Sequence, residues 1–581
     1  MNVVVELHKE DKPEKFIHLS KSGCQGFCQM GPLLSILPDK ILYCQSKVED
    51  IPEIVEKTLV NNEIIDRLLY VDPNTKKHCK GQDEIPFYTL QNRTVLSNCA
   101  VLDPNDIREY ISRNGYRSAE KVWKTMTPEE TCNLMLASGL KGRGGAGFPT
   151  GRKWNFARVE PGSKKYVICN GDEGDPGAFM DRSVMEGDPH AVLEGMMIAS
   201  HAIGADEGWI YVRMEYPLAV ERMRNAIKAA EEIGILGDNV FGTGRKFHVN
   251  IMEGAGAFVC GEETALIASI EGNRGMPSPK PPFPAKSGLW GKPTVINNVE
   301  TLAIIPTIFQ KGPEWYSSMG TETAKGTKTF ALTGHVANTG LIEVPFGTTL
   351  RKILLDIGGG VVDNKGKLTG LDGFKVVQIG GPSGGCLTSE HLDVPIDYAT
   401  LSKYGAIVGS GGLVVMNKDS CMVSVARFFM QFTQNESCGK CVPCREGTKA
   451  MLNLLDEIIA GNGTEKTLDE LEELALAVSK ASLCALGKTA PNPVLSTLKY
   501  FRDEYLAHVR DKHCPTGNCK ALAKPEILVD RCTGCTLCAR KCPVNAITGE
   551  PKKPHKIDIT KCIKCGECAR NCRFDAIIGV N

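Results

Sequence analysis

The spacing of apolar and polar positions divides the first half of the chain into two units. Residues 1–75 alternate short apolar runs with a Gly-Cys turn and end in the helical pattern Ile51–Lys57, which predicts a small α/β unit. Residues 80–324 interleave glycine-rich loops with helical patterns. In one of these, Thr127–Glu130 opens the run Thr131–Ser138 as a helix N-terminal signature. This second unit is predicted to be a large α/β body.

The second half changes pattern three times. Residues 325–415 favour short strands, at Thr329–Gly334 and Phe374–Gly381, around one helix at Thr349–Ile357, and a compact β-grasp-like insert fits them. Residues 420–510 carry leucine and isoleucine at helical spacing, which predicts a helical bundle. Residues 511–524 are then expected to be a linker. Residues 525–581 contain an internal repeat.

Composition narrows the class of protein. The 581 residues exceed what one hydrophobic core usually serves. Lys+Arg and Asp+Glu number 68 each, so nothing indicates a nucleic acid or a membrane surface as partner. The start lacks an export signal, and the most apolar later stretch, Ala406–Met416, is well short of the ~18 apolar residues of a membrane helix. A cytoplasmic protein is predicted, whose 24 cysteines indicate metal ligation rather than disulfides.

The C-terminal repeat has the spacing of a ferredoxin with two [4Fe–4S] clusters. A Cys-x2-Cys-x2-Cys-x3-Cys run begins at Cys532 and recurs thirty residues later at Cys562. In the second run, Arg573 follows the last cysteine, a position where proline is usual. The fourth cysteine of each run ligates the other cluster in such domains. One cluster is therefore assigned Cys532, Cys535, Cys538 and Cys572, and the other Cys542, Cys562, Cys565 and Cys568. Paired CxxC motifs also bind zinc, but eight cysteines in a duplicated run favour the clusters.

A further cysteine group lies upstream. Cys438, Cys441 and Cys444 share one tight loop before a helix, and Cys484, at the turn after the next helical pair, can close a four-thiolate site. On spacing alone, zinc is the alternative to a cluster. The nearby Gly487-Lys488-Thr489 is no phosphate loop, because Ser482 occupies the position of the required glycine.

Two more cysteine pairs are less complete. Cys514 and Cys519 can form a mixed sulfur and nitrogen zinc site with His513, His508 or His555, and the alternative is two unligated cysteines in a linker. We assign this zinc site to His513, Cys514, Cys519 and His555. Cys24 and Cys28 supply only two of the four ligands of a [2Fe–2S] cluster, so the first unit is expected to hold none of its own.

Several loops have residues typical of nucleotide binding. Gly142–Gly147 contains GxGxxG but follows a helix, whereas a Rossmann fingerprint follows a strand. Its glycines still let backbone N–H groups approach a phosphate, helped by Arg143 or Lys153. A predicted strand, Lys165–Cys169, leads into Asn170–Gly177, whose acceptors can bind ribityl and ribose hydroxyls. Taken alone, the glycine-rich loop is equally typical of a flexible turn, and Asn170–Gly177 is more typical of a solvated turn. Three further segments follow, Gly254–Thr264, Lys280–Pro284 and Asn297–Thr301.

These segments, in this order, resemble the NADH-binding flavoprotein subunit of respiratory complex I and its soluble relatives, over residues 125–490. The ferredoxin repeat and the Cys24/Cys28 head are similar to the beta subunit of NAD-linked, electron-bifurcating [FeFe]-hydrogenases and related formate dehydrogenases or transhydrogenases. The resemblance implies a multidomain α/β protein: a truncated thioredoxin-like ferredoxin head, a Rossmann-like FMN- and NADH-binding domain, a β-grasp (SLBB) insert, a helical bundle with a [4Fe–4S] cluster, and a 2[4Fe–4S] ferredoxin domain. Full-length relatives have an earlier cysteine pair, and this chain begins too late to contain it.

The resemblance also implies site residues. FMN contacts fall on Gly142, Arg143, Gly144, Lys153, Asn170, Asp172, Glu173, Phe258, Gly261, Glu262, Asn297, Asn298 and Thr301. The nicotinamide nucleotide is expected at Phe148, Phe156, Asp175, Glu263, Lys280 and Phe283. Phe258 stands where tyrosine is expected, and Asp175 where the respiratory enzymes have glutamate. Cys438, Cys441, Cys444 and Cys484 map to the [4Fe–4S] cluster beside the flavin.

Glu263 predicts a preference for NAD over NADP. A carboxylate can accept hydrogen bonds from a free ribose 2′-OH but repels a 2′-phosphate. Lys280 can offset part of this repulsion if it swings toward the phosphate. The alternative is that Glu263 only favours the dipole at a helix N-terminus.

The implied activity is exchange of hydride between NAD(H) and FMN, with single electrons passing through three [4Fe–4S] clusters. The implied partners are a thioredoxin-like [2Fe–2S] subunit, ferredoxin, and a catalytic hydrogenase, formate dehydrogenase or transhydrogenase subunit, with electron bifurcation. No [FeFe] active-site domain is visible in the sequence, so hydrogen or formate chemistry is expected on another chain. Rival hypotheses are a non-bifurcating NAD(P)H:ferredoxin oxidoreductase subunit and a scaffold subunit with an inactive nucleotide site.

Overall fold

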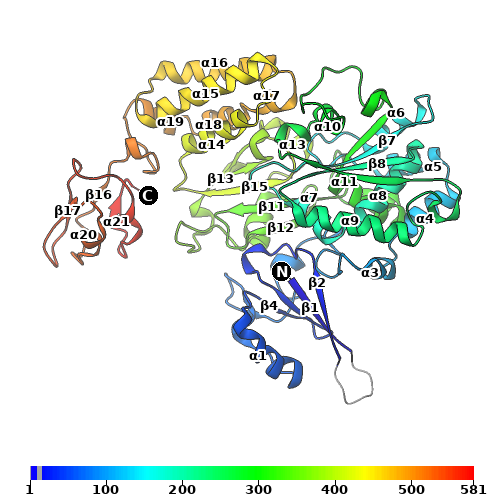
Figure 1. Ribbon diagram of the computed structural model, residues 1–581. Coiled ribbons are helices and arrows are strands. Elements are labelled where there is room, and N and C mark those ends of the chain that lie inside the picture. The colour runs from blue at the N-terminus through cyan, green and yellow to red at the C-terminus, as the bar shows by residue number, and fades with distance from the viewer. Residues whose placement is uncertain (1, 9–15, 581) are drawn as a thin grey trace.

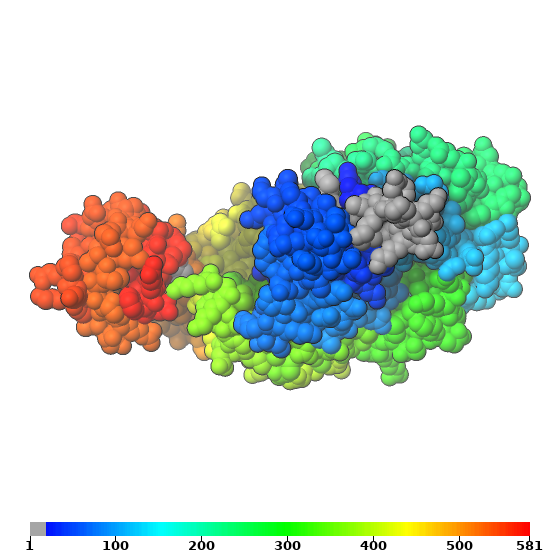
Figure 2. Space-filling model, turned by 90° about the horizontal axis from the view of Figure 1, so that it is seen from below, coloured from blue at the N-terminus to red at the C-terminus, as the bar shows by residue number. Residues whose placement is uncertain are grey.

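The computed structural model describes residues 2–8 and 16–580. Figure 1 shows a central body, an N-terminal unit packed below it, and a C-terminal unit set apart beyond the helical bundle. Seen from below, in Figure 2, the C-terminal unit protrudes at one end of the molecule. Within the described ranges, every helix is too short or too polar to span a bilayer.

The N-terminal unit contains a mixed four-stranded sheet in the order β2-β1-β3-β4. Its regular elements are β1 (Asn2–His8), β2 (Phe16–Ser22), β3 (Leu34–Leu37), β4 (Ile41–Tyr43), α1 (Ile51–Glu53), β5 (Tyr70–Val71), β6 (His78–Cys79) and α2 (Pro86–Thr89). Part of the unit does not form a core of its own. Phe27 and Tyr70 are buried in the same apolar cluster as Phe330 and Val344, which lie beyond the body in the chain.

The body is built on a parallel sheet in the order β10-β7-β8-β9. Its strands are β7 (Tyr166–Gly171), β8 (Glu207–Arg213), β9 (His248–Gly254) and β10 (Thr294–Asn298). The strand predicted at Lys165–Cys169 is confirmed as β7. Its near-continuous burial is typical of a parallel sheet covered on both faces.

Helices surround this sheet. They are α3 (Ile107–Ser112), α4 (Arg117–Thr125), α5 (Pro128–Ser138), α6 (Thr150–Val159), α7 (Met180–Gly187), α8 (Pro189–Ile203), α9 (Pro217–Glu232), α10 (Glu263–Ile270), α11 (Val299–Lys311) and α12 (Pro313–Ser317). The predicted start of α5 is confirmed, because Thr127 and Glu130 form a reciprocal capping box. Every residue of α8 is buried, including Glu194, which accepts hydrogen bonds from the Tyr110 hydroxyl at 2.6 Å and the Tyr116 N–H at 2.8 Å.

The insert is a mixed sheet in the order β12-β11-β15-β13-β14, with β11 and β15 parallel at its centre. Its regular elements are β11 (Thr327–Gly334), β12 (Gly340–Pro345), a helical turn (Lys352–Ile357), β13 (Phe374–Ile379), β14 (Gly385–Thr388), α13 (Tyr398–Lys403) and β15 (Gly412–Asn417). The two strands and the helix predicted from the sequence are therefore all present.

The bundle and the C-terminal unit complete the chain. The bundle consists of α14 (Met422–Asn435), α15 (Val442–Ala460), α16 (Glu465–Ala481), α17 (Ala485–Thr489), α18 (Asn492–Tyr500) and α19 (Arg502–Val509). The C-terminal unit repeats a strand-helix-strand motif: β16 (Glu526–Ile527), α20 (Leu537–Lys541), β17 (Ile547–Thr548), then β18 (Lys556–Ile557), α21 (Glu567–Arg570), β19 (Ile577–Ile578). Each two-stranded sheet takes one strand from each half, since β16 pairs with β19 and β17 with β18.

A buried ion pair joins the insert to the body. Lys328 of β11 contacts Glu300 of α11, and the two side chains are 0% and 2% exposed. Glu300 also accepts a hydrogen bond from the Thr329 N–H at 2.9 Å. Lys328→Met would leave a buried carboxylate unpaired, so we expect it to lower the free energy of unfolding by about 3–5 kcal/mol.

Differential scanning calorimetry measures this loss as a lower Tm. The double variant Lys328→Met/Glu300→Gln removes the unpaired charge and should recover much of the loss. A double variant as unstable as Lys328→Met would contradict the prediction.

Candidate functional site

The predicted nucleotide loops meet at the carboxyl edge of the parallel sheet, where open α/β folds bind ligands. The loops after β7, β9 and β10 all leave the sheet at this edge. The last two lead into α10 and α11, so two helix N-termini lie there and favour an anionic ligand. Glu262 caps α10 by accepting the Thr264 N–H at 2.9 Å, and Asn298 caps α11 by accepting the Thr301 N–H at 3.3 Å.

The glycine-rich loop lies against this edge. The Gly142 N–H donates to the Phe148 carbonyl at 2.8 Å, which closes the loop. A Cβ added at Gly144 would lie 3.1 Å from Cβ of Asn298, so glycine permits this close approach. The Tyr398 hydroxyl, from the insert, donates to the Gly142 carbonyl at 3.0 Å. The insert therefore helps to shape the loop.

Asp172 is the strongest sign of a polar ligand in the loop after β7. Both carboxylate oxygens are buried and have no hydrogen-bond partner among the described residues. Burial raises the pKa of Asp172 to about 7. A buried carboxylate without donors is costly, and hydroxyl groups of a ligand would satisfy it. The expected ribityl hydroxyls of FMN fit this requirement.

The Arg143 side chain, expected to help bind a phosphate, has its donors engaged within the protein. The residue is 1% exposed, and its guanidinium donates to the carbonyls of Lys325 at 2.7 Å and Lys141 at 3.0 Å and to the Tyr316 hydroxyl at 2.5 Å. It also stacks on the Phe346 ring, 4.7 Å from the ring centroid. The side chain is therefore engaged in holding the loop to the insert, and a ligand is left with the Arg143 main chain.

Other expected FMN residues have their polar groups engaged within the protein. Glu173 accepts the N–H groups of Asp181 and Arg182, both at 3.1 Å, at the start of α7. Asn297 accepts the Trp154 indole N–H at 2.9 Å. These contacts explain why the loops hold their shape. Further polar contacts of the expected residues include Asn170 Nδ2 to Gly261 O at 2.9 Å, Lys153 Nζ to Ile296 O at 3.0 Å, and Arg143 N to Thr301 Oγ1 at 2.8 Å.

Three aromatic residues expected to bind the nicotinamide nucleotide have exposed side chains. Phe148 and Phe156 are 41% and 44% exposed, with ring centroids 6.4 Å apart, and Phe283 is 58% exposed. Lys280 Nζ lies 2.9 Å from a carboxylate oxygen of Glu262 and 2.5 Å from one of Glu263. This lysine is therefore already neutralised by two carboxylates.

Asp175 is held by the insert. Its carboxylate accepts a hydrogen bond from the Ser410 hydroxyl, in the turn before β15. Burial raises its pKa to about 6, and the Ser410 hydrogen bond opposes that rise. A Cβ added at Gly381 would lie 2.8 Å from an Asp175 oxygen, so a second turn of the insert also closes on this carboxylate.

The four cysteines assigned to the bundle cluster converge beside the nucleotide loops. Cys441 and Cys484 precede α15 and α17, while Cys438 and Cys444 lie on either side of Cys441. All four pack in one apolar cluster with Ile168 of β7 and other body residues. The expected doubling back of the chain to Cys484 is therefore present.

Three contacts tie this cysteine loop to the nucleotide loops. Lys440 Nζ donates to the Pro277 carbonyl at 2.6 Å, and the Phe258 N–H donates to Glu436 at 2.9 Å. Arg274 reaches the Cys438 carbonyl at 3.5 Å. A cluster held here lies next to the loops that would carry a flavin.

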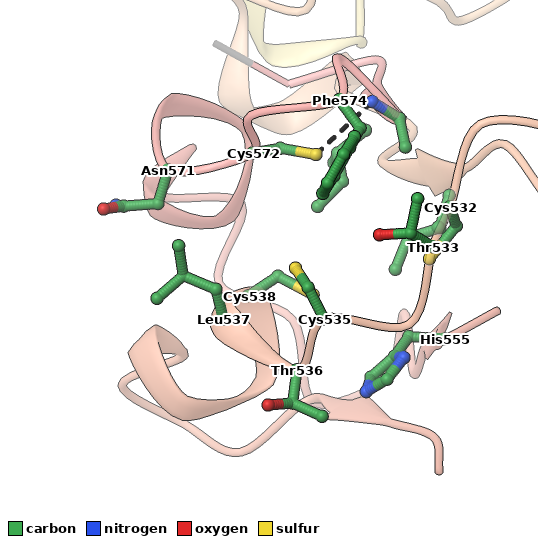
Figure 3. Close-up of a pocket in the computed structure, with 13 residues that line it drawn as sticks. Cys532, Thr533, Cys535, Thr536, Leu537, Cys538, His555, Asn571, Cys572 and Phe574 are labelled. Carbon is green, nitrogen blue, oxygen red and sulfur yellow. Dashed lines mark hydrogen bonds between the residues drawn. The ribbon is translucent and has the colours of Figure 1, made fainter. Parts of the chain in front are cut away.

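The C-terminal unit contains two cavities, each lined by four cysteines from both halves. The first is lined by Cys532, Cys535, Cys538 and Cys572, and Figure 3 shows them around a common space. The second is lined by Cys542, Cys562, Cys565 and Cys568. Each cavity thus takes its fourth cysteine from the other half, as the ferredoxin spacing predicts.

A further group of potential metal ligands lies between the bundle and the C-terminal unit. Cys421, His508, Cys514 and Cys519 are all buried, with their ligand atoms within 4.8 Å of one another. His508 Nε2 lies 3.3 Å from Cys519 Sγ and 3.5 Å from Cys421 Sγ. Its Nδ1 lies 2.7 Å from the Glu504 carbonyl oxygen, a contact typical of metal-bound histidines.

This group corrects the zinc assignment. Neither His513 nor His555 belongs to it, and His555 instead lines the first cavity of the C-terminal unit. The histidine involved is His508, which the sequence offers only as an alternative. Cys421 was missed altogether, because it lies 93 positions before Cys514 and no local spacing connects the two.

Known proteins match this arrangement closely. Residues 135–307 match the Nuo51 FMN-binding domain, residues 424–508 the NADH-ubiquinone oxidoreductase-F iron–sulfur binding region, and residues 531–576 a 4Fe-4S dicluster domain. The NADP-reducing hydrogenase subunit HndC of Solidesulfovibrio fructosivorans is 54% identical over 465 residues, which cover 80% of this chain and 93% of that protein. The chain belongs to the Nuo51 family of flavoprotein subunits.

Other relatives agree. An NADH-quinone oxidoreductase subunit of Rhizobium meliloti is 42% identical, with 72% of this chain and 98% of that protein covered. The crystal structure of an NAD+-reducing [NiFe]-hydrogenase in the H2-reduced state superposes with a TM-score of 0.63 at 30% identity, covering 84% of this chain and 76% of that chain. As a Nuo51 family member, the protein is a flavin and iron–sulfur oxidoreductase subunit that acts on NADH or NADPH. Its cofactors are FMN and [4Fe–4S] clusters.

Metal analysis tests the cluster assignment. Three [4Fe–4S] clusters should give about twelve iron and twelve sulfide per chain in anaerobically prepared protein. Cys484→Ser removes one assigned ligand of the bundle cluster, so we expect the iron content to fall toward about eight.

Cys260→Ser is the matched control. Cys260 is buried in the same apolar cluster but is not an assigned ligand, so this variant should keep the wild-type iron content. Cys484→Ser protein with the wild-type iron content and spectrum would exclude Cys484 as a ligand.

Proposed function

We propose that this chain is the diaphorase subunit of a multisubunit oxidoreductase. In this role it exchanges hydride with NAD(H) at FMN and passes single electrons through three [4Fe–4S] clusters to or from a partner. The observation that carries the proposal is the convergence of the nucleotide loops and the Cys438 loop at one edge of the parallel sheet. Bound FMN supplies the exchange between two-electron and one-electron chemistry.

The protein side chains then have positioning roles. The glycine loop and the start of α11 offer N–H groups to the FMN phosphate, and Asp172 accepts ribityl hydroxyls. Phe148, Phe156 and Phe283 offer rings on which the nicotinamide and adenine can stack and which limit the access of water. The buried carboxylate of Asp172 argues against the scaffold hypothesis, since an inactive site gains nothing from it.

The partner belongs to the same proposal. HndC is named as a hydrogenase subunit, and the superposed structure is an NAD+-reducing [NiFe]-hydrogenase. These names favour a hydrogenase as the partner. Formate dehydrogenase, transhydrogenase or ferredoxin are the other partners implied by the sequence resemblance, and electron bifurcation at the flavin is implied by that resemblance alone. A non-bifurcating NAD(P)H:ferredoxin oxidoreductase is the alternative. Mass spectrometry of the complex purified under anaerobic conditions distinguishes these partners.

The finer domain assignments are also proposals. The strand order of the insert, with two parallel strands at the centre, supports a β-grasp (SLBB) domain. The mixed sheet of the N-terminal unit, followed by a helix, supports a thioredoxin-like head. The cytoplasmic location predicted from the sequence is likewise a proposal.

Preference for NAD over NADP is supported by the carboxylates at the start of α10. Lys280 is held between Glu262 and Glu263, and Lys153 lies 3.9 Å from Glu263. These lysines leave little positive charge free for a 2′-phosphate. Glu263→Gln removes one negative charge, so we expect the ratio of kcat/KM for NADPH to that for NADH to rise about tenfold, or about 1.4 kcal/mol.

Steady-state reduction of ferricyanide by NADH and NADPH measures this ratio and tests the diaphorase activity itself. Glu271→Gln, after the last turn of the same helix, is the matched control and should leave the ratio unchanged. A wild-type ratio above one, or an unchanged ratio in Glu263→Gln, would reject the role of Glu263. Protein with bound FMN that reduces no acceptor would reject the proposed function.

We also propose zinc at Cys421, His508, Cys514 and Cys519. Three sulfurs and one nitrogen are a donor set that zinc prefers, and Zn–S bonds of about 2.3 Å place tetrahedral sulfurs about 3.8 Å apart. The Cys421 and Cys519 sulfurs lie 3.6 Å apart. The site joins the start of α14, the end of α19 and the linker, so it would brace the C-terminal unit against the bundle.

Elemental analysis should find about one zinc per chain, lost in His508→Ala. His513→Ala is the matched control and should retain it, because His513 lies outside the group. Zinc retained in His508→Ala and lost in His513→Ala would restore the assignment made from the sequence.

A further inference from the structure

The two halves of the C-terminal unit share a cysteine pattern but line their cavities with different side chains. Thr533 and Thr536 line the first cavity, whereas Ile563 and Gly566, thirty positions later, line the second. His555 also lines the first cavity, and no histidine lines the second. Two clusters bound here would therefore meet different hydrogen-bonding surroundings.

His555 is held firmly at the first cavity. It is 2% exposed, and its Nδ1 lies 3.1 Å from the Lys553 carbonyl oxygen. A Cβ added at Gly549 would lie 2.6 Å from Cγ of the ring, so the Gly549 backbone packs directly on it. Figure 3 shows the ring beside the cavity, on the side of Cys535 and Thr536.

The second ring nitrogen is the informative atom. His555 Nε2 is buried and has no hydrogen-bond partner among the described residues. An unpaired buried polar group costs about 1–3 kcal/mol, so a partner is expected. The four cysteines of the same cavity indicate what that partner is, because a [4Fe–4S] cluster bound by them presents sulfur atoms as acceptors.

We propose that His555 donates a hydrogen bond from Nε2 to a sulfur of the cluster held by Cys532, Cys535, Cys538 and Cys572, and that this cluster consequently has the higher reduction potential of the two. Reduction adds negative charge, which a hydrogen-bond donor stabilises, so donors to cluster sulfurs raise the potential. The proposed bond requires a proton on Nε2, since a histidine ring nitrogen donates only when it is protonated.

The consequence is an order within the pair. An electron shared by the two clusters rests mainly on the one beside His555, and the other cluster is the more strongly reducing. This inference rests on the proposed cluster ligands and is independent of the nucleotide site.

The test is a redox titration of the full-length protein, prepared anaerobically and followed by EPR. In His555→Leu, one of the three cluster midpoints should fall by the equivalent of a tenfold change in its reduction equilibrium, about 59 mV for one electron. The other two midpoints should not move. An iron content equal to that of wild type shows that the clusters are retained.

Two companion variants separate the hydrogen bond from simple packing. His555→Gln keeps an N–H donor and should restore much of the midpoint. Asn571→Leu is the matched control: Asn571 lines the same cavity, but its amide already donates to Glu567 at 2.7 and 2.8 Å, and Figure 3 shows it turned outward. Its midpoints should equal those of wild type.

A direct spectroscopic measurement is independent of cluster retention in the variants. In wild-type protein labelled with 15N-histidine, ENDOR of the reduced clusters should show a 15N coupling, and His555→Gln should lose it. Unchanged midpoints in His555→Leu, equal midpoints in the Leu and Gln variants, or no 15N coupling in wild type would overturn the proposal. About four iron per chain in wild type would instead reject the two-cluster assignment on which it rests.

Discussion

The docking of the Cys438 loop onto the body is the contact on which the rest of the arrangement depends. Cys444 and Leu486, from the bundle, share one apolar cluster with Ile168 and Leu266 of the body. This contact places four cysteines beside the loops proposed to bind a nucleotide. Without it, a flavin domain and an iron–sulfur domain would be two separate modules. In this chain, the proximity of the cysteine loop to the nucleotide loops therefore depends on apolar packing between two domains.

The insert contacts the candidate nucleotide loops directly. Tyr398 and Ser410 reach the glycine loop and Asp175 with side-chain hydroxyls. A Cβ added at Gly145 would lie 3.3 Å from the backbone of Gly409, so the two turns approach as closely as glycine allows. The buried pair of Lys328 and Glu300 anchors the same interface. A change in the insert therefore changes the nucleotide loops.

Local patterns were enough to predict much of the fold and part of the site. The capping residues Thr127 and Glu130 and the strand Lys165–Cys169 depend on neighbours a few positions away, and all of them are confirmed. The grouping of the C-terminal cysteines, with Cys572 in the first cavity, also followed from spacing, because a short linker leaves few ways for the chain to close around a cluster. The domain boundary predicted near residue 75 does not separate two independent cores, since Phe27 shares a core with the insert.

The sequence by itself determined which residue types could serve a flavin, a nucleotide and iron, and it placed them on short loops whose geometry is set by adjacent residues. Only the tertiary structure decided which of them face a ligand. Arg143 is turned to Tyr316, Cys421 joins His508 and Cys519, and His555 lines a cluster cavity instead of a zinc site. The reason is physical: these partners lie far apart along the chain, and their approach depends on how whole domains pack, for which no local spacing carries a signal.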